Sequence, residues 1–174
     1  MIKTKRLVIK PYSIDDENRM IEILINKAIK DSYIIPDFST FEDAKNYFMK
    51  LMDFSLSAQH YERGIYFDNQ LIGFVNDVEI ENKSIEIGYV IHPNYHHQGY
   101  ATEMLAAVIN DLFSIGYKEV KCCAFEFNRA SFRVMEKCQM KPTNQVVEMT
   151  HQFKKQRCIY YAIKRSDFKV LELP

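Results

Sequence analysis

One segment, residues 84–103, combines residue types that could bind an anion. Its first half is rich in β-branched and aromatic residues, which predicts a strand over residues 84–91. Pro93 and Gly99 then predict a loop, and the apolar spacing beyond them predicts a helix over about 99–115. The first N–H groups of a helix lack internal partners and carry partial positive charge. A small-residue loop that leads into such a helix is therefore suited to bind phosphate.

Glu86 is the carboxylate best placed to act as a base. It lies in the predicted strand between Ile85 and Ile87. A carboxylate within a central strand is unfavourable unless it is paired or faces a wet cleft. We therefore consider Glu86 a candidate general base for an ammonium acceptor, directly or through water. A salt bridge or an exposed strand face is the alternative, and Glu79 on the preceding strand is the rival base.

Asn128 and Ser131 stand at the start of another predicted helix, which ends near Cys138. Asn is well suited to cap a helix N-terminus. The Ser131 hydroxyl would serve better as a hydrogen-bond donor than as a strong acid.

The histidines and cysteines do not indicate metal or thiol chemistry. His92, His96 and His97 do not match zinc-ligand spacing, and no Cys or Asp is close to them, so we expect no metal. Cys122 and Cys123 are adjacent on a predicted core strand, where cysteine usually serves as a small apolar residue. The four cysteines form no C-x-x-C pair, which favours reduced thiols in the cytoplasm.

The remaining elements must position these residues. Capping-box patterns at Ser13 and Thr40 open two helices, which run to about Ile29 and about Ser57. Further strands are expected at residues 4–10, 62–67, 71–80, 118–125, 145–152 and 157–163. This order predicts an α/β (α+β) fold, a mixed sheet with helices on its faces, in one domain over residues 1–174.

Composition excludes several classes of protein. Lys plus Arg and Asp plus Glu both number 23, and no long basic run occurs, so we expect no nucleic-acid partner. No apolar run approaches the ~18–20 residues that span a membrane. The N-terminus lacks the pattern of a signal peptide, so we expect a cytoplasmic protein that does not act at a membrane.

Four blocks carry a family resemblance. His96-x-x-Gly99-x-Ala101 resembles the coenzyme A pyrophosphate loop of GNAT-superfamily N-acetyltransferases, [Arg/Gln]-x-x-Gly-x-[Gly/Ala]. Residues 4–11 and 99–103 are similar to the RimJ/RimL-type branch, which acetylates ribosomal-protein alanines. Asn128-x-x-Ser131, followed by Glu-Lys at residues 136–137, is similar to that branch's downstream signature. The resemblance implies the GNAT acyl-CoA N-acyltransferase fold, in which two neighbouring central strands splay apart around pantetheine.

The resemblance also implies site residues and a co-substrate, acetyl-CoA. Glu86 and Ser131 would be catalytic, Ser131 assisting departure of the thiolate. Tyr33, Phe38 and Glu86 would contact the acceptor. Backbone N–H groups near Val90 and Ile91 would stabilise the oxyanion. The implied coenzyme-binding set is Val90, Ile91, His96, His97, Gln98, Gly99, Tyr100, Ala101, Thr102, Asn128 and Ser131.

Two positions depart from the family pattern. His96 replaces Arg or Gln, and no Lys or Arg stands within the loop, so we expect no permanent cation there. Histidine is mostly neutral at pH 7, so coenzyme affinity is predicted to rise as the pH falls toward 6. Gln139 stands where the family has Gly in a left-handed helix cap. Gln can adopt that conformation at a cost of roughly 1 kcal/mol.

The resulting expectation is an N-acetyltransferase that moves the acetyl group of acetyl-CoA to a primary amine by direct attack. The amine could be a protein N-terminus, a small-molecule amine or an amino sugar. A non-catalytic coenzyme A-binding regulatory module is the alternative. A nucleotide-binding protein is less favoured, because the loop matches neither nucleotide-binding glycine pattern. The sequence leaves the protein as a monomer or a homodimer.

Overall fold

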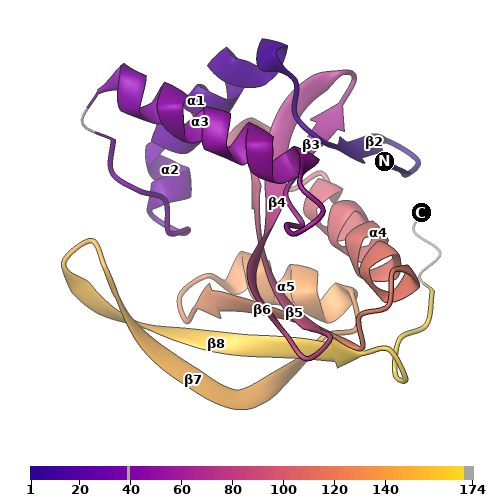
Figure 1. The fold of residues 1–174 in the computed structure, drawn as a ribbon. Helices are drawn as coiled ribbons and strands as arrows, with labels where there is room; N and C mark the ends of the chain where they lie inside the picture. Colours follow the sequence, from indigo (N-terminus) through magenta and orange to yellow (C-terminus); the bar gives the residue numbers. More distant parts are fainter. Residues whose placement is uncertain (39, 171–174) are drawn as a thin grey trace. The chain divides into compact units, whose positions relative to one another are not determined.

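The computed structural model describes residues 1–38 and 40–170, which form two compact units (Figure 1). The first unit comprises Met1–Asn76 and Tyr89–Tyr100, and the second comprises Asp77–Gly88 and the chain from Ala101 onward. The boundaries fall within two strands, β4 (Gln70–Glu81) and β5 (Ser84–Ile91).

The first unit builds an antiparallel meander beneath helices. β2 pairs with both β1 and β3, and β3 pairs with β4. Helices α1 and α3 lie side by side in this unit (Figure 1). The bounds of the elements not yet given are β1 Ile2–Lys3, β2 Leu7–Lys10, a 3-10 turn Ile14–Asp16, α1 Glu17–Ile25, α2 Lys27–Lys30, α3 Phe41–Leu56 and β3 Arg63–Phe67.

Capping explains where these helices begin. The Thr40 hydroxyl accepts from the Asp43 N–H at 3.1 Å, and the Asp43 carboxylate accepts from the Thr40 N–H at 2.9 Å. This confirms the predicted start of α3. The expectation of one continuous helix from Ser13 to about Ile29 is wrong. Asn26 is extended, with ψ 120°, and its side chain accepts from the Ile29 N–H, so a new helix begins there.

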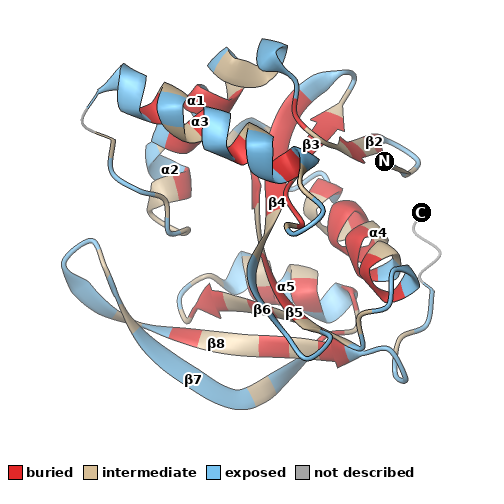
Figure 2. Ribbon diagram, in the orientation of Figure 1, coloured by how far each residue is buried: buried red, intermediate tan, exposed pale blue. Residues whose placement is uncertain are grey.

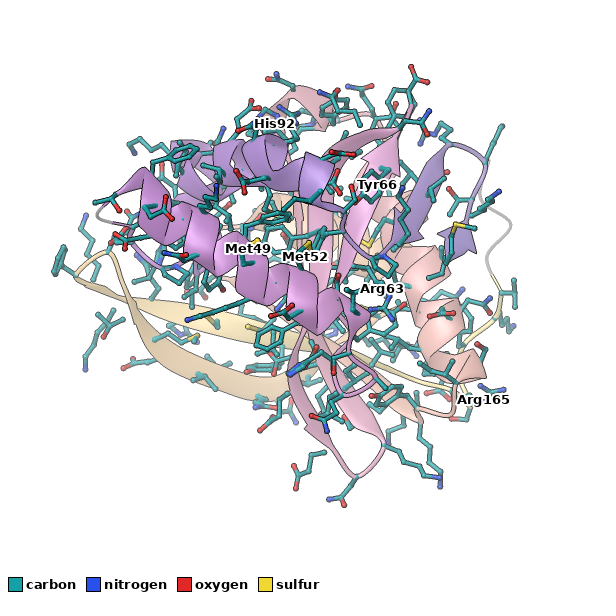
Figure 3. All side chains as sticks on the ribbon, turned by 45° about the horizontal axis from the view of Figure 1, so that its top comes forward. Met49, Met52, Arg63, Tyr66, His92 and Arg165 are labelled. Atoms are coloured by element: carbon teal, nitrogen blue, oxygen red, sulfur yellow. The ribbon has the colours of Figure 1, made fainter. Side chains whose placement is uncertain are left out.

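The core of the first unit lies between these helices and the meander. Met52 of α3 packs against this core, whereas Met49, one turn away, is 36% exposed (Figure 3). Its buried members include aromatic and aliphatic side chains from helices and strands alike: Tyr12, Met20, Ile23, Leu24, Ile29, Phe48, Tyr66, Leu71, Phe74 and Val90.

The second unit contains the long helix and the C-terminal hairpin. β5 pairs in parallel with β6, β6 pairs antiparallel with β8, and β8 pairs antiparallel with β7. Figure 2 shows α4 largely buried and β7 largely exposed. The Arg165 guanidinium donates to the Phe113 carbonyl and ties the chain after β8 to the end of α4 (Figure 3). Its elements are α4 Tyr100–Ser114, β6 Glu119–Phe125, α5 Arg129–Lys137, β7 Lys141–His151 and β8 Lys154–Lys164.

The strands together form a mixed eight-stranded sheet in the hydrogen-bonded order β1-β2-β3-β4-β5-β6-β8-β7. This confirms the predicted fold class, whereas the short strand β1 and the separate helix α2 were not predicted. Three hairpin turns place two successive residues at positive φ: residues 68–69, 82–83 and 152–153. Such turns match the right-handed twist of the strands that they join. Within the described residues, no helix is long and apolar enough to cross a membrane.

Candidate active site

The loop of residues 92–99 joins β5 to α4 and turns sharply at two positions. His97 and Gly99 have φ of 59° and 84°, in the left-handed region. Glycine adopts that region without strain, which accounts for Gly99. The loop then enters α4 at Tyr100, whose ring is buried, while Ala101 and Thr102 are half-buried in the first turn of the helix.

Arg6, from the start of the chain, places a guanidinium group against this loop. Its Nη1 donates to the Gln98 carbonyl at 2.9 Å, and its guanidinium carbon lies 4.4 Å from the centre of the Tyr100 ring. The loop itself carries no Lys or Arg, as its sequence indicates, and the permanent cation beside it comes from outside the loop. Arg6 lies 92 residues from Gln98 in the sequence, so inspection of the loop motif alone could not find it.

Two other polar side chains of the loop, those of His96 and Gln98, bond to nearby backbone carbonyls. The His96 Nε2 lies 2.7 Å from the Ile91 carbonyl, and a carbonyl only accepts, so Nε2 carries the proton. The Gln98 amide donates to the Asn94 carbonyl at 3.2 Å, and His97 is exposed. These contacts hold the loop in shape. Contact of His96, His97 and Gln98 with phosphate, and a rise in affinity toward pH 6, stay predictions.

Glu86 is enclosed by hydrogen-bond donors from neighbouring strands of the second unit. Its side chain is 7% exposed, and it accepts hydrogen bonds from the Tyr160 hydroxyl and the Cys123 thiol. Cys123 and Tyr160 are direct cross-strand partners on β6 and β8. The glutamate is thus neither on an exposed strand face nor simply in a salt bridge.

Burial sets the direction of the Glu86 pKa. Desolvation raises the pKa of this carboxyl above its usual value, and the charge of Glu79 raises it further. The hydrogen bonds from Tyr160 and Cys123 and the charge of Lys121 lower it, without reversing the rise. A carboxylate whose pKa is raised is a stronger base than an ordinary glutamate. Glu79, the rival base, is exposed on β4.

The neighbouring thiols are protonated. Burial raises the pKa of Cys123 to about 12, and it also raises the pKa of the buried Cys122 well above its ordinary value. The thiolate is the nucleophilic form of cysteine, so these residues are poor nucleophiles at neutral pH. Cys123 instead serves as a hydrogen-bond donor to Glu86.

Asn128 caps α5, as predicted. Its Oδ1 accepts from the Ser131 N–H at 3.1 Å, so this cap does not use the NH2 group of the amide. Ser131 is half-buried in the first turn of α5. Gln139, beyond the end of this helix, has φ 67°, so the left-handed cap is present without glycine. Its amide makes two hydrogen bonds with the backbone of Lys169, which offset part of the strain.

Val90 and Ile91 end β5 in the first unit and are both buried. A Cβ added to Gly73 of β4 would lie 2.0 Å from the Val90 carbonyl oxygen, so the two backbones approach closely there. Only glycine permits that approach. Oxyanion stabilisation by the Val90 and Ile91 N–H groups stays a prediction.

Tyr33 and Phe38, the predicted acceptor contacts, are both partly buried against the core of the first unit. The Tyr33 hydroxyl donates to Asn76 Oδ1 at 2.7 Å, and the Phe38 ring lies 5.4 Å from that of Tyr47. Both side chains are therefore fixed by neighbours while part of each remains accessible. Their contact with an acceptor stays a prediction.

The parallel ladder between β5 and β6 pairs Ser84, Ile85 and Glu86 with Glu119, Val120 and Lys121. β6 continues beyond that point and pairs with β8 as far as Phe125. Glu86 thus stands at the last β5–β6 pair that the second unit shows among its described residues.

The three histidines do not assemble a metal centre in the part of the chain that the structure describes. No group there of three or more His, Cys, Asp or Glu side chains could hold a metal ion. His92 is buried, with Nε2 3.4 Å from a Glu22 oxygen, and desolvation lowers the pKa of its ring. His96 bonds to the backbone, as described above.

Sequence reasoning missed Arg6 and Tyr160. Arg6 belongs to the opening block of residues 4–11, which indicated the family but no site role. Tyr160 reaches Glu86 only because β8 pairs with β6 in a register that brings it opposite Cys123. No local motif encodes that register.

Comparisons with known proteins agree with this geometry. The acetyltransferase (GNAT) domain pattern matches residues 6–141. The chain is 30% identical over 147 residues to the uncharacterized N-acetyltransferase YnaD of Bacillus subtilis (strain 168), covering 80% of this chain and 82% of that one.

Two solved structures share the fold. RimL, a ribosomal-protein acetyltransferase in complex with coenzyme A, superposes with a TM-score of 0.83 at 16% identity, covering 92% of this chain and 95% of that one. The spermidine N-acetyltransferase of Vibrio cholerae, with coenzyme A and spermine, gives a TM-score of 0.80 at 16% identity, covering 94% and 98%. The chain therefore belongs to the GNAT family of acetyltransferases, and membership makes it an acetyl-CoA-dependent acetyltransferase.

Proposed function

We propose that the chain transfers the acetyl group of acetyl-CoA to a primary amine by direct attack of the amine on the thioester. Family membership supplies the donor. The observation that carries the choice of an amine acceptor is Glu86, a buried carboxylate whose pKa is raised by desolvation. An alkylamine is protonated at neutral pH, so it needs such a base before it can attack.

In this proposal Glu86 takes the proton of the ammonium group, directly or through a water molecule. The neutral amine then attacks the thioester carbonyl, and the backbone N–H groups of Val90 and Ile91 stabilise the oxyanion. Ser131 donates a hydrogen bond to the departing thiolate. The close packing of Gly73 against Val90 holds the end of β5 in place, which supports a preorganised oxyanion site.

The coenzyme site of the proposal begins at the loop. His97 and Gly99 both have left-handed backbone conformations, which would turn N–H groups of the loop toward the diphosphate. The N-terminus of α4 adds the positive end of the helix dipole. The Asn128 amide group donates to pantetheine, which is compatible with its cap because the cap uses only Oδ1. The proposed set is His96, His97, Gln98, Gly99, Tyr100, Ala101, Thr102, Asn128 and Ser131 with the Val90 and Ile91 backbone.

The acceptor is a peptide N-terminus or a small-molecule amine, with Tyr33 and Phe38 in its wall. The two structural relatives act on a ribosomal protein and on spermidine, and both are too distant in sequence to choose between these classes. A thiol-release assay with acetyl-CoA over a panel of peptide, polyamine, amino-sugar and amino-acid acceptors tests the proposal. Turnover of at least one primary amine is expected.

Glu86→Gln gives the sharper test. Loss of a general base should lower kcat/KM by about 10²-fold or more at neutral pH. The difference in kcat/KM between the variant and the wild type should decrease as the pH approaches the acceptor's own pKa, because more of the amine is then already unprotonated. A variant with an unchanged pH profile would remove Glu86 from the mechanism. Coenzyme binding without turnover of any amine would instead favour the regulatory module.

The proposal includes one domain over residues 1–174 and a cytoplasmic location. The four cysteines are free thiols, which suits a reducing compartment. Size-exclusion chromatography with light scattering distinguishes the monomer from the homodimer.

A further inference from the structure

We propose that Arg6 supplies the positive charge that binds the diphosphate of the coenzyme, and that it positions the loop which carries that site. This deepens the proposed function, since it rests on the same coenzyme loop. It does not depend on which amine is the acceptor.

The first support is the placement of the guanidinium. Nη1 donates to the Gln98 carbonyl at 2.9 Å, and Nη2 lies 3.4 Å from the point that a Cβ on Gly99 would occupy. Arg6 is therefore fixed over the residue at which the loop turns into α4. A positive charge held there stands beside the backbone on which a diphosphate would lie.

The second support is the stacking on Tyr100. The guanidinium carbon lies 4.4 Å from the centre of that ring, which is buried as the first residue of α4. A cation over an aromatic face is stabilised by the ring, and the planar group keeps its orientation. Tyr100 is itself held by Phe67, with 4.9 Å between the ring centres. Arg6 thus rests on a rigid platform.

The third support is the chemistry of the loop itself. Its own side chains include no Lys or Arg, and the side chains of His96 and Gln98 already bond to backbone carbonyls. A diphosphate bears negative charge at neutral pH, and backbone N–H groups supply only partial charges. Arginine is charged at every physiological pH, so a full positive charge adds to the partial charges of the N–H groups.

Three variants separate charge from position. Arg6→Gln removes the charge, Arg6→Lys keeps the charge but loses the planar fork, and Lys5→Gln removes the same charge from the neighbouring exposed residue as a control. Calorimetry on the full chain measures Kd for coenzyme A, for dephospho-coenzyme A, which lacks the 3′-phosphate, and for pantetheine, which lacks the diphosphate.

We expect Arg6→Gln to weaken coenzyme A roughly tenfold or more at low salt, as loss of a charge-assisted contact would. The affinity for dephospho-coenzyme A should fall by the same factor, and the affinity for pantetheine should not change. Raising the salt from about 0.05 M to about 0.5 M should shrink the difference from wild type. Arg6→Lys should recover part of the affinity at low salt, and Lys5→Gln should bind like wild type.

Equal coenzyme affinity of wild type and Arg6→Gln at low salt would overturn the inference. So would equal losses in Arg6→Gln and Arg6→Lys with no salt dependence, because a purely structural role is then sufficient. Melting temperatures of each variant verify folding, and the salt dependence of the wild type tests the charge even if one variant fails to fold. Coenzyme binding is measured without an acceptor. If the wild type binds coenzyme A but acetylates no amine, the proposed function is contradicted and the inference about Arg6 is not.

Discussion

The side chains around Glu86 set its basicity through opposing effects. Burial and the charge of Glu79 raise its pKa, while hydrogen bonds from Tyr160 and Cys123 lower it. The carboxylate is thereby kept more basic than usual and still oriented. The sequence made Glu86 a candidate base because a charged residue within a central strand is unfavourable unless it is paired or faces a wet cleft. It could not identify Tyr160, whose role depends on strand register.

Tyr160→Phe and Glu79→Gln should shift the acidic limb of the kcat/KM profile in opposite directions. The tyrosine hydrogen bond lowers the Glu86 pKa, so its loss moves the limb to higher pH. The Glu79 charge raises that pKa, so its loss moves the limb to lower pH. Initial rates between pH 5 and 9, at acceptor concentrations below KM, measure both shifts.

Tyr161→Phe is the matched control for Tyr160→Phe. The Tyr161 hydroxyl donates to Glu136 at 3.0 Å, so the limb should stay at the wild-type pH. If Glu79→Gln instead abolishes activity while Glu86→Gln retains it, Glu79 is the base and the assignment is reversed.

At the scale of elements, caps made the helices predictable. Thr40 with Asp43 and Asn128 both act where the sequence placed them. The break at Asn26 was not predicted, because the apolar spacing continues across it. The backbone there is extended, and the Asn26 side chain accepts from the Ile29 N–H. Local sequence patterns thus predict where a helix begins more accurately than they predict how far it continues.

Asn128→Asp should separate the cap from the coenzyme. Asp accepts the Ser131 N–H as well as Asn does, so the melting temperature should stay within about 2 °C of wild type. Loss of the donor amide should weaken coenzyme A by roughly fivefold. Asn128→Ala should show the weaker binding and also lose about 1 kcal/mol of stability. Thermal unfolding and calorimetry measure the two effects.

Thr40→Ala is the control for cap loss alone, because it removes a cap from α3 without touching α5. It should lower the melting temperature and leave the coenzyme Kd unchanged. Wild-type affinity in Asn128→Asp would mean that the amide group does not contact pantetheine.

At the scale of the whole chain, the order of elements and the sheet's mixed character followed from the sequence, since periodicity and turn residues are local signals. The contacts that complete the site were not predictable in the same way. Arg6 reaches the loop across 92 residues, and Glu86 meets its donors across two strand pairings. The chemistry that we propose for the site thus depends on long-range pairing that no local motif encodes.

The same pairing gives Glu86 a measurable effect on the stability of the whole molecule. Its pKa is raised by burial, so the folded chain binds the Glu86 proton more tightly than the unfolded chain does. The wild type therefore gains stability as the pH falls through the folded pKa, in full below the unfolded value near ~4.3. Above the folded pKa that contribution is lost.

Glu86→Gln cannot ionise and lacks this dependence. The stability of the variant minus that of the wild type should therefore be larger at pH 7 than at pH 4. Any constant effect of the amide group cancels in that difference, as do all other titrating groups that the two proteins share. Urea unfolding at both pH values measures it. An equal stability difference at pH 4 and pH 7 would mean that Glu86 ionises as easily in the folded chain as in water. Burial would then not make Glu86 a stronger base than an ordinary glutamate.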